Sequence, residues 1–133
     1  MSFALKFGII ALGGALGALG RTGMTAMVAS LVDGMATPGK ILGTMAVNIL
    51  GCFLMGTARS AVELAGWGTT ETHAFLFSGF LGAFTTFSTF EANTITLWRE
   101  GERLAAGIYM SGSVVGGLVA FLIGWSMLSR LVG

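Results

Sequence analysis

Four long apolar stretches divide the chain, and this division limits its fold more than any other feature of the sequence. The stretches cover approximately residues 3–32, 41–62, 72–98 and 104–131. Each is long enough for a helix that crosses a bilayer, which needs about 20 mostly apolar residues. Because the linkers are short, the sequence predicts one all-α membrane domain of four transmembrane helices over residues 1–133.

Charged residues are scarce: they make up 10% of the chain, whereas hydrophobic residues make up 54%. A soluble domain usually carries about 25% charged residues, so the composition favours the lipid bilayer as the surroundings of this chain. The net charge is +1 and the cations are isolated, which argues against nucleic acid as a partner. The single cysteine, Cys52, excludes an intramolecular disulfide and is interpreted as a small buried hydrophobe.

The cations next to the predicted helices are balanced between the two sides of the membrane. If the number of crossings is even, each side carries three of them: Lys6, Arg59 and Arg130 on the side of the termini, and Lys40, Arg99 and Arg103 on the other. Asymmetry in Lys and Arg normally sets the orientation of a membrane protein. Without it, we expect copies to insert in both directions and to pair as an antiparallel, dual-topology homodimer. Insertion in one orientation despite the weak bias is the alternative.

A few polar residues lie inside the apolar stretches, where unpaired polar groups are costly and often mark function. Asn48 is either an interhelical hydrogen-bond partner or a pore-lining donor, because its amide offers two N–H groups. Tyr109 and Ser113 are four residues apart and therefore share one face of the fourth helix. Arg21, in the first stretch, is expected to face an aqueous vestibule or a partner, since burying it unpaired is costly, and in a vestibule it would attract anions.

The segment FTTFSTF, residues 84–90, follows two glycines in the third stretch. Gly79 and Gly82 weaken a helix, and the hydroxyls of Thr85 and Thr86 compete for backbone partners. The sequence therefore predicts that the third helix breaks mid-membrane between residues 82 and 86. Freed carbonyls at such a break can hold a cation, whereas the N-terminus of a half-helix favours an anion.

Phe87 and Phe90 are three residues apart, so they share one side of a helix. The edge of an aromatic ring is positive and its face is negative. Two rings that present their edges would form a weakly electropositive wall for a small anion. Core packing is the alternative interpretation of this pair.

Three segments resemble the Fluc (CrcB) fluoride channel family: GALGALGR at 14–21, GTMAVNILGCFLMG at 43–56 and GFLGAFTTFSTFEANT at 79–94. The resemblance extends over nearly the whole chain, and GFLG-x-x-TTFSTF is a specific signature of that family. Members are antiparallel homodimers with two fluoride pores and a central structural sodium ion between the subunits. The resemblance thus implies a passive, fluoride-selective channel that exports cytoplasmic fluoride, in a prokaryotic inner membrane.

The resemblance also implies roles for individual residues. Arg21 matches the vestibule arginine, and the backbone carbonyls of Gly82 and Thr85 match those that hold Na⁺. Two positions depart from the pattern: Asn93 stands where a glutamate is frequent, and Gly117 stands where a serine can lie. The residues that match the fluoride pore are Asn48, Phe87, Ser88, Thr89, Phe90, Tyr109 and Ser113.

Other classes of function have less support in the sequence. A fluoride/proton antiporter needs a buried acid for a proton relay, and Glu91 is the one candidate. A small dual-topology multidrug transporter needs an acid deep in the first helix, where this chain has Arg21. A small structural membrane protein would not need the hydroxyl-aromatic segment. No Ser–His–Asp set, phosphate loop or metal-ligand cluster stands out, so the chain is predicted not to be an enzyme.

Overall fold

The computed structural model describes residues 2–32, 38–66 and 68–132. Every regular element in these ranges is helical, which confirms the prediction of an all-α chain. Three helices are long: α1 (Phe3–Leu31), α2 (Gly39–Ala65) and α6 (Arg103–Val132). They agree with the predicted ranges except at the end of α2, which continues past residue 62. That helix ends at Gly66, whose left-handed backbone (φ 66°) is a common helix C-terminus for glycine.

The third apolar stretch is folded as a series of shorter helices. A short α3 leads into η1, a π-helix, and η1 continues directly into α4. Thr85 and Thr86 then leave helical geometry before α5 begins. The elements are α3 (Thr70–Thr72), η1 (His73–Leu81), α4 (Gly82–Phe84) and α5 (Phe87–Arg99).

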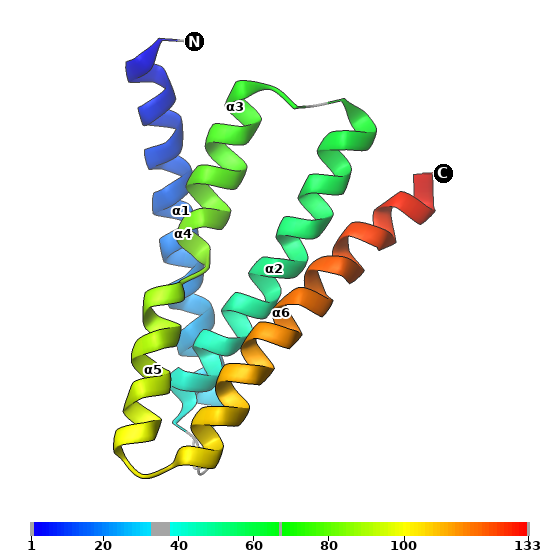
Figure 1. Ribbon diagram of the computed structural model, residues 1–133. Helices are drawn as coiled ribbons and strands as arrows, with labels where there is room; N and C mark the ends of the chain where they lie inside the picture. Colours follow the sequence, from blue (N-terminus) through cyan, green and yellow to red (C-terminus); the bar gives the residue numbers. More distant parts are fainter. Residues whose placement is uncertain (1, 33–37, 67, 133) are drawn as a thin grey trace.

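The chain runs up and down between two ends of the molecule. Both termini and the connection from α2 to α3 lie at one end, whereas the turn from α5 to α6 lies at the other (Figure 1). That turn is a Schellman motif, in which Gly101 takes a φ of 87° and the Glu102 N–H donates to the Leu97 carbonyl at 2.9 Å. The tight turn therefore makes α5 and α6 antiparallel neighbours.

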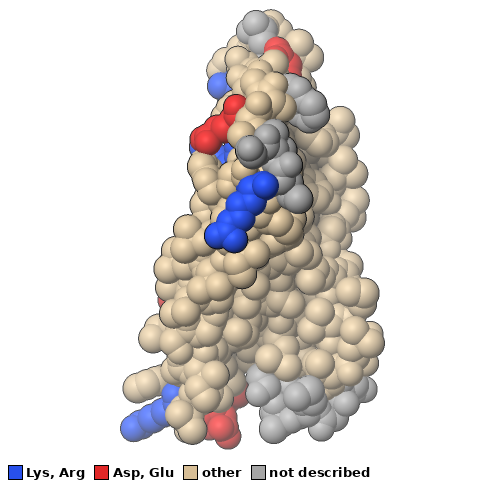
Figure 2. Space-filling model, turned by 90° about the vertical axis from the view of Figure 1, so that its right-hand side faces the viewer, with Lys and Arg blue, Asp and Glu red and all other residues tan. Residues whose placement is uncertain are grey.

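Three of the described helices, α1, α2 and α6, are long and apolar enough to cross a membrane. The third stretch is not among them because its break leaves pieces that are too short; α5, the longest of these, has 13 residues. Charged side chains gather toward the two ends of the face in Figure 2, with a broad uncharged band between them. These features are those of a multi-pass membrane protein.

Close packing of the helices depends on glycines. Gly17 of α1 lies against the backbone of η1, and a methyl group there would overlap the Phe80 carbonyl. In the same way, Gly56 of α2 lies against the Phe121 carbonyl of α6. In lipid, where packing rather than hydrophobicity joins helices, small residues permit such close backbone contact. The α1–η1 and α2–α6 pairs therefore hold the break between α4 and α5 in a defined place.

We expect Gly17→Ala to destabilise the folded chain by about 1–3 kcal/mol, because the added methyl forces α1 away from η1. Gly23→Ala is the matched control on the same helix, since the described chain has no atom within 4 Å of the new methyl position. The measurement is an SDS titration of the purified protein in detergent, followed by tryptophan fluorescence. Equal midpoints for the two variants would contradict the role of Gly17.

Candidate functional site

The break in the third stretch is formed by two consecutive residues with extended backbone. Thr85 has φ −81° and ψ 157°, and Thr86 has φ −148° and ψ 111°. Before the break, the Thr85 N–H still donates to the Leu81 carbonyl at 3.2 Å. After it, the Thr86 Oγ1 caps α5 by accepting from the Thr89 N–H at 3.3 Å. The break thus lies inside the predicted interval from residue 82 to 86.

The break removes hydrogen-bond donors from backbone carbonyls. In a continuous helix, the N–H groups of Thr86 and Thr89 would donate to the carbonyls of Gly82 and Thr85. Here the Thr86 N–H donates to Asn48 Oδ1 and the Thr89 N–H donates to Thr86 Oγ1. The carbonyls of Gly82 and Thr85, the predicted sodium ligands, have therefore lost their helical donors. Gly82 is exposed on the surface of the chain, and Thr85 is half-buried.

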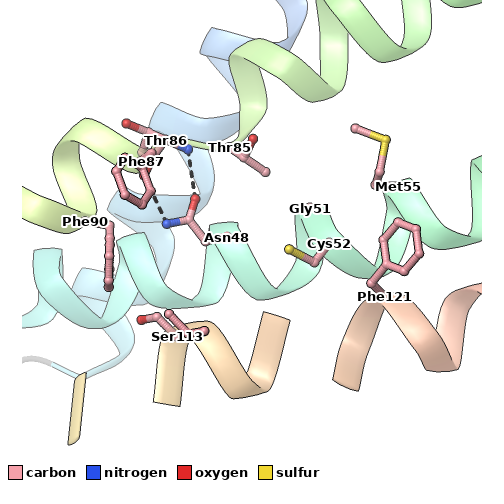
Figure 3. Close-up of a pocket in the computed structure, with 11 residues that line it drawn as sticks. Asn48, Gly51, Cys52, Met55, Thr85, Thr86, Phe87, Phe90, Ser113 and Phe121 are labelled. Atoms are coloured by element: carbon pink, nitrogen blue, oxygen red, sulfur yellow. Dashed lines mark hydrogen bonds between the residues drawn. The ribbon is translucent and has the colours of Figure 1, made fainter. Parts of the chain in front are cut away.

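Asn48 of α2 pairs with the backbone of Thr86 through both ends of its amide (Figure 3). Its Oδ1 accepts from the Thr86 N–H at 2.8 Å, and its Nδ2 donates to the Thr86 carbonyl at 3.1 Å. This pairing satisfies both backbone groups of Thr86, which would otherwise be costly at this depth. We call it the Asn48 clamp. Because Nδ2 carries two hydrogens and this bond uses one, its second N–H is available to a guest.

A cavity of about 310 Å³, here called the amide cavity, lies beside the clamp. Four of the predicted pore residues line it: Asn48, Phe87, Phe90 and Ser113. The Ser113 side chain is 8% exposed, and its hydroxyl has no hydrogen-bond partner among the described residues. A buried hydroxyl without a partner indicates space for a polar guest such as water or an ion. The cavity therefore offers two free donors, from Asn48 and Ser113, beside two aromatic rings.

The aromatic rings form a ladder that leads from the surface into the chain. The Phe87 and Phe90 centroids are 5.6 Å apart with ring planes at 43°, and Phe90 and Tyr109 are 5.6 Å apart at 33°. Phe87 is 73% exposed, whereas Phe90 is 6% exposed. At the inner end, Asn93 Nδ2 donates to the Tyr109 hydroxyl at 3.2 Å. Asn93, which departs from the family pattern, thus has a polar partner in the predicted track.

A second hollow of about 460 Å³ lies between α1, α2 and α5. Arg21 and Lys40 both line it, as do Thr44 and Thr89, and no Asp or Glu of the described residues is among its lining residues. We call it the basic hollow. Thr86 lines both the basic hollow and the amide cavity, so both spaces border the break. Sequence reasoning missed Lys40 here, because its position at the start of the second stretch is equally typical of a residue flanking the membrane.

Two of the predicted pore residues, Ser88 and Tyr109, lie outside both the amide cavity and the basic hollow. Ser88 is exposed and lines neither space, although its hydroxyl lies 3.5 Å from that of Thr86. Tyr109 is buried against Phe90 and also lines neither space. Within the part of the chain that the structure describes, no group of three or more His, Cys, Asp or Glu side chains could hold a metal ion. Backbone carbonyls and side-chain oxygens at the break are the oxygen atoms that the described site offers to a cation.

Comparison with known families identifies the chain. The family described as "CrcB-like protein, Camphor Resistance (CrcB)" matches residues 8–125. This chain belongs to the CrcB family. A protein of Paracoccus denitrificans named "Fluoride-specific ion channel FluC" is 46% identical over 115 residues, which cover 86% of this chain and 87% of the relative. A protein of Rhizobium etli with the same name is 37% identical over 124 residues, covering 93% and 96%.

A third relative, with lower sequence identity, carries the same name as these two. It comes from Chlorobium phaeobacteroides and is 35% identical over 118 residues, which cover 89% of this chain and 88% of the relative. These matches confirm the family that the three sequence segments resemble. Because the CrcB relatives are named as ion channels, family membership also confirms that the chain is not an enzyme.

Proposed function

We propose that this chain forms a fluoride-selective passive channel that exports fluoride from the cytoplasm. The observation that carries the proposal is the amide cavity, where a free Asn48 N–H, an unpartnered Ser113 hydroxyl and a pair of phenylalanine rings meet at a helix break. A small anion that leaves water needs donors in place of its hydration shell. The names of the relatives supply the identity of the ion.

The anion path runs from the basic hollow to the amide cavity. Arg21 and Lys40 raise the local concentration of anions, because charges of one sign in a concave space focus the electric field. Thr86, which lines both spaces, marks the passage between them. Beyond it, the ion meets the Asn48 amide and the edges of Phe87 and Phe90. The full charges of Arg21 and Lys40 therefore attract the ion before it enters the narrow part of the path. A fixed cation inside the narrow part would hold the ion too tightly.

The functional unit is an antiparallel, dual-topology homodimer with two pores. In this arrangement the third stretch crosses the membrane as a fourth, broken span. Phe87, 73% exposed, and the exposed Gly82 lie on a surface that a second copy would cover. The balanced cations support insertion in both directions. We place the dimer in the inner membrane of a prokaryotic cell, and the relatives, which are named as ion channels, support a membrane location.

The break also fits a structural sodium ion between the two copies. Oxygen ligands suit this cation, and carbonyls of unwound helices bind it in membrane proteins. The Gly82 and Thr85 carbonyls have lost their helical donors, so two from each copy would supply four ligands. Bound there, the ion would neutralise the negative ends of these carbonyl dipoles and join the two copies.

The structure gives less support to the alternatives. Glu91 is exposed and lines neither the amide cavity nor the basic hollow, so it is poorly placed for the proton relay of an antiporter. The described residues that line the basic hollow include two cations and no acid, which is the wrong charge for a cationic drug. The position of Glu91 and the charge of the basic hollow therefore both favour a passive anion path.

Liposomes loaded with fluoride test the proposal. We expect the reconstituted protein to release fluoride rapidly when valinomycin and potassium balance the charge, with no imposed proton gradient, as measured with a fluoride electrode. Empty liposomes treated in the same way provide the control. Release that requires a proton gradient would favour the antiporter, and no release under either condition would contradict channel function.

Removal of sodium should weaken the dimer. We expect purification in N-methyl-D-glucamine salts instead of sodium salts to lower the dimeric fraction, because the four proposed carbonyl ligands would then repel one another. Size-exclusion chromatography with light scattering measures this fraction, and return of Na⁺ should restore it. An unchanged dimer from which elemental analysis shows that sodium has left would contradict the proposed ion site.

A further inference from the structure

Two sulfur-containing side chains line the amide cavity, and the proposed anion path does not use either of them. Cys52 and Met55 are three residues apart on α2, and both line the cavity; Figure 3 shows their side chains. Side chains at this spacing lie on the same helix face, with Cβ atoms about 5–6 Å apart. Cys52 is a half-buried free thiol. The unbranched Met55 side chain has three rotatable bonds, so its sulfur can turn toward that of Cys52.

The cavity beside these sulfurs can hold a polar guest. Ser113 lines the same space and is more than nine-tenths buried, and its hydroxyl has no hydrogen-bond partner among the described residues. Since buried hydroxyls are normally paired, this one indicates that water or an ion enters the cavity. Cys52, Met55 and Ser113 all line this one space, so the two sulfurs and the hydroxyl border the same cavity.

The position of the thiol depends on a glycine of α6. A Cβ atom at Gly117 would lie 3.2 Å from Cys52 Sγ, which is closer than most real Cβ contacts. Because Gly117 has no side chain, the thiol has room beside α6 while remaining at the cavity wall. The serine that can lie at this position in the family would crowd the sulfur.

We propose that Cys52 and Met55 form a two-sulfur site for a soft monovalent metal ion, Cu⁺ or Ag⁺, in the amide cavity. Thiolate and thioether sulfur are the protein ligands that such ions prefer. On binding, the S–H bond of Cys52 breaks, the S–metal bond forms and the proton passes to water. Met55 donates a sulfur lone pair and loses no proton. The net change is Cys–SH + Ag⁺ → Cys–S–Ag + H⁺.

The bound ion would obstruct the anion path, and this part of the inference rests on the proposed channel function. Asn48 and Phe87 line the same cavity as the two sulfurs. A metal held by Cys52 and Met55 fills part of that space and fixes the Met55 side chain across it. Fluoride is then excluded from the free Asn48 N–H and from the ring edges.

Silver binding by the purified full-length protein tests the site without any transport measurement. Titration with AgNO₃ in chloride-free buffer, followed by calorimetry, should give one tight site per chain in the wild type. We expect Cys52→Ser to remove this site and Met55→Leu to weaken it by about tenfold or more. Met110→Leu is the matched control, because Met110 is half exposed on α6 and lines neither space. Tight binding that survives in Cys52→Ser, or that is equal in Met55→Leu and Met110→Leu, would overturn the site.

Fluoride efflux with and without Ag⁺, compared within each variant, tests the obstruction. We expect Ag⁺ to reduce wild-type efflux by about tenfold or more, dithiothreitol to restore it, and Cys52→Ser efflux to be insensitive to Ag⁺. If silver binds through Cys52 but wild-type efflux does not change, the obstruction is overturned. If silver binds in this way and no variant releases fluoride, the metal site stands and the proposed channel function fails.

Discussion

Asn48→Asp reduces fluoride efflux by about tenfold or more and destabilises the folded chain by about 1–3 kcal/mol. In the wild type, Asn48 Oδ1 accepts from the Thr86 N–H at 2.8 Å, and aspartate keeps an oxygen in this position. Its second oxygen, however, replaces the Nδ2 that donates to the Thr86 carbonyl at 3.1 Å. Two acceptors then face each other, and the amide cavity gains a negative charge while it loses its free N–H. The added charge repels an anion, and the lost N–H removes a donor that would bind it.

Asn93→Asp is the matched control for this effect. Asn93 is also half-buried, but it donates to the Tyr109 hydroxyl at 3.2 Å, and that hydroxyl can turn to donate to a carboxylate instead. We therefore expect a much smaller loss of stability, and a smaller loss of efflux because Asn93 lines the basic hollow and not the amide cavity. SDS titration and liposome efflux with a fluoride electrode measure the two quantities. If Asn48→Asp matched Asn93→Asp in both, Asn48 would be neither the clamp nor a donor to the ion.

Phe90→Ile should also reduce fluoride efflux by about tenfold, because it removes the central ring of the Phe87–Phe90–Tyr109 ladder. Isoleucine keeps most of the buried volume, so the stability cost should remain below about 1.5 kcal/mol. Phe87 is 73% exposed in the single chain, and Phe87→Ile should lower efflux with almost no change in the stability of that chain. In both variants the dimer should still assemble.

Phe7→Ile is the control for the two ring variants, because Phe7 is exposed near the N-terminus and lines neither the amide cavity nor the basic hollow. Efflux by each variant is compared with its dimeric fraction from light scattering, which separates lost conduction from lost assembly. Wild-type efflux from both Phe87→Ile and Phe90→Ile would remove the ring edges from the mechanism and leave core packing as their role.

Local patterns were sufficient for the helical architecture. The ranges of α1 and α6 follow from hydropathy, and the position of the break follows from Gly82 and the two threonines after it, because helix formation depends on neighbouring residues. The same patterns could not find the end of α2, since its last turns contain both polar and apolar residues and end at Gly66. They also missed the π-helical geometry of η1, which packs closely against Gly13 and Gly17 of α1.

The site itself depends on contacts between residues that are distant in the chain. Asn48 was identifiable as a polar residue in an apolar stretch, but its partner, Thr86, lies 38 residues away. Likewise, Lys40 joins Arg21 in the basic hollow, and Cys52 takes its place beside Gly117, only through the packing of α2 against other helices. Hydropathy and helix-breaking residues act over a few neighbours and so are readable in the sequence. Hydrogen-bond partners and cavity walls arise where helices meet, and they require the folded arrangement.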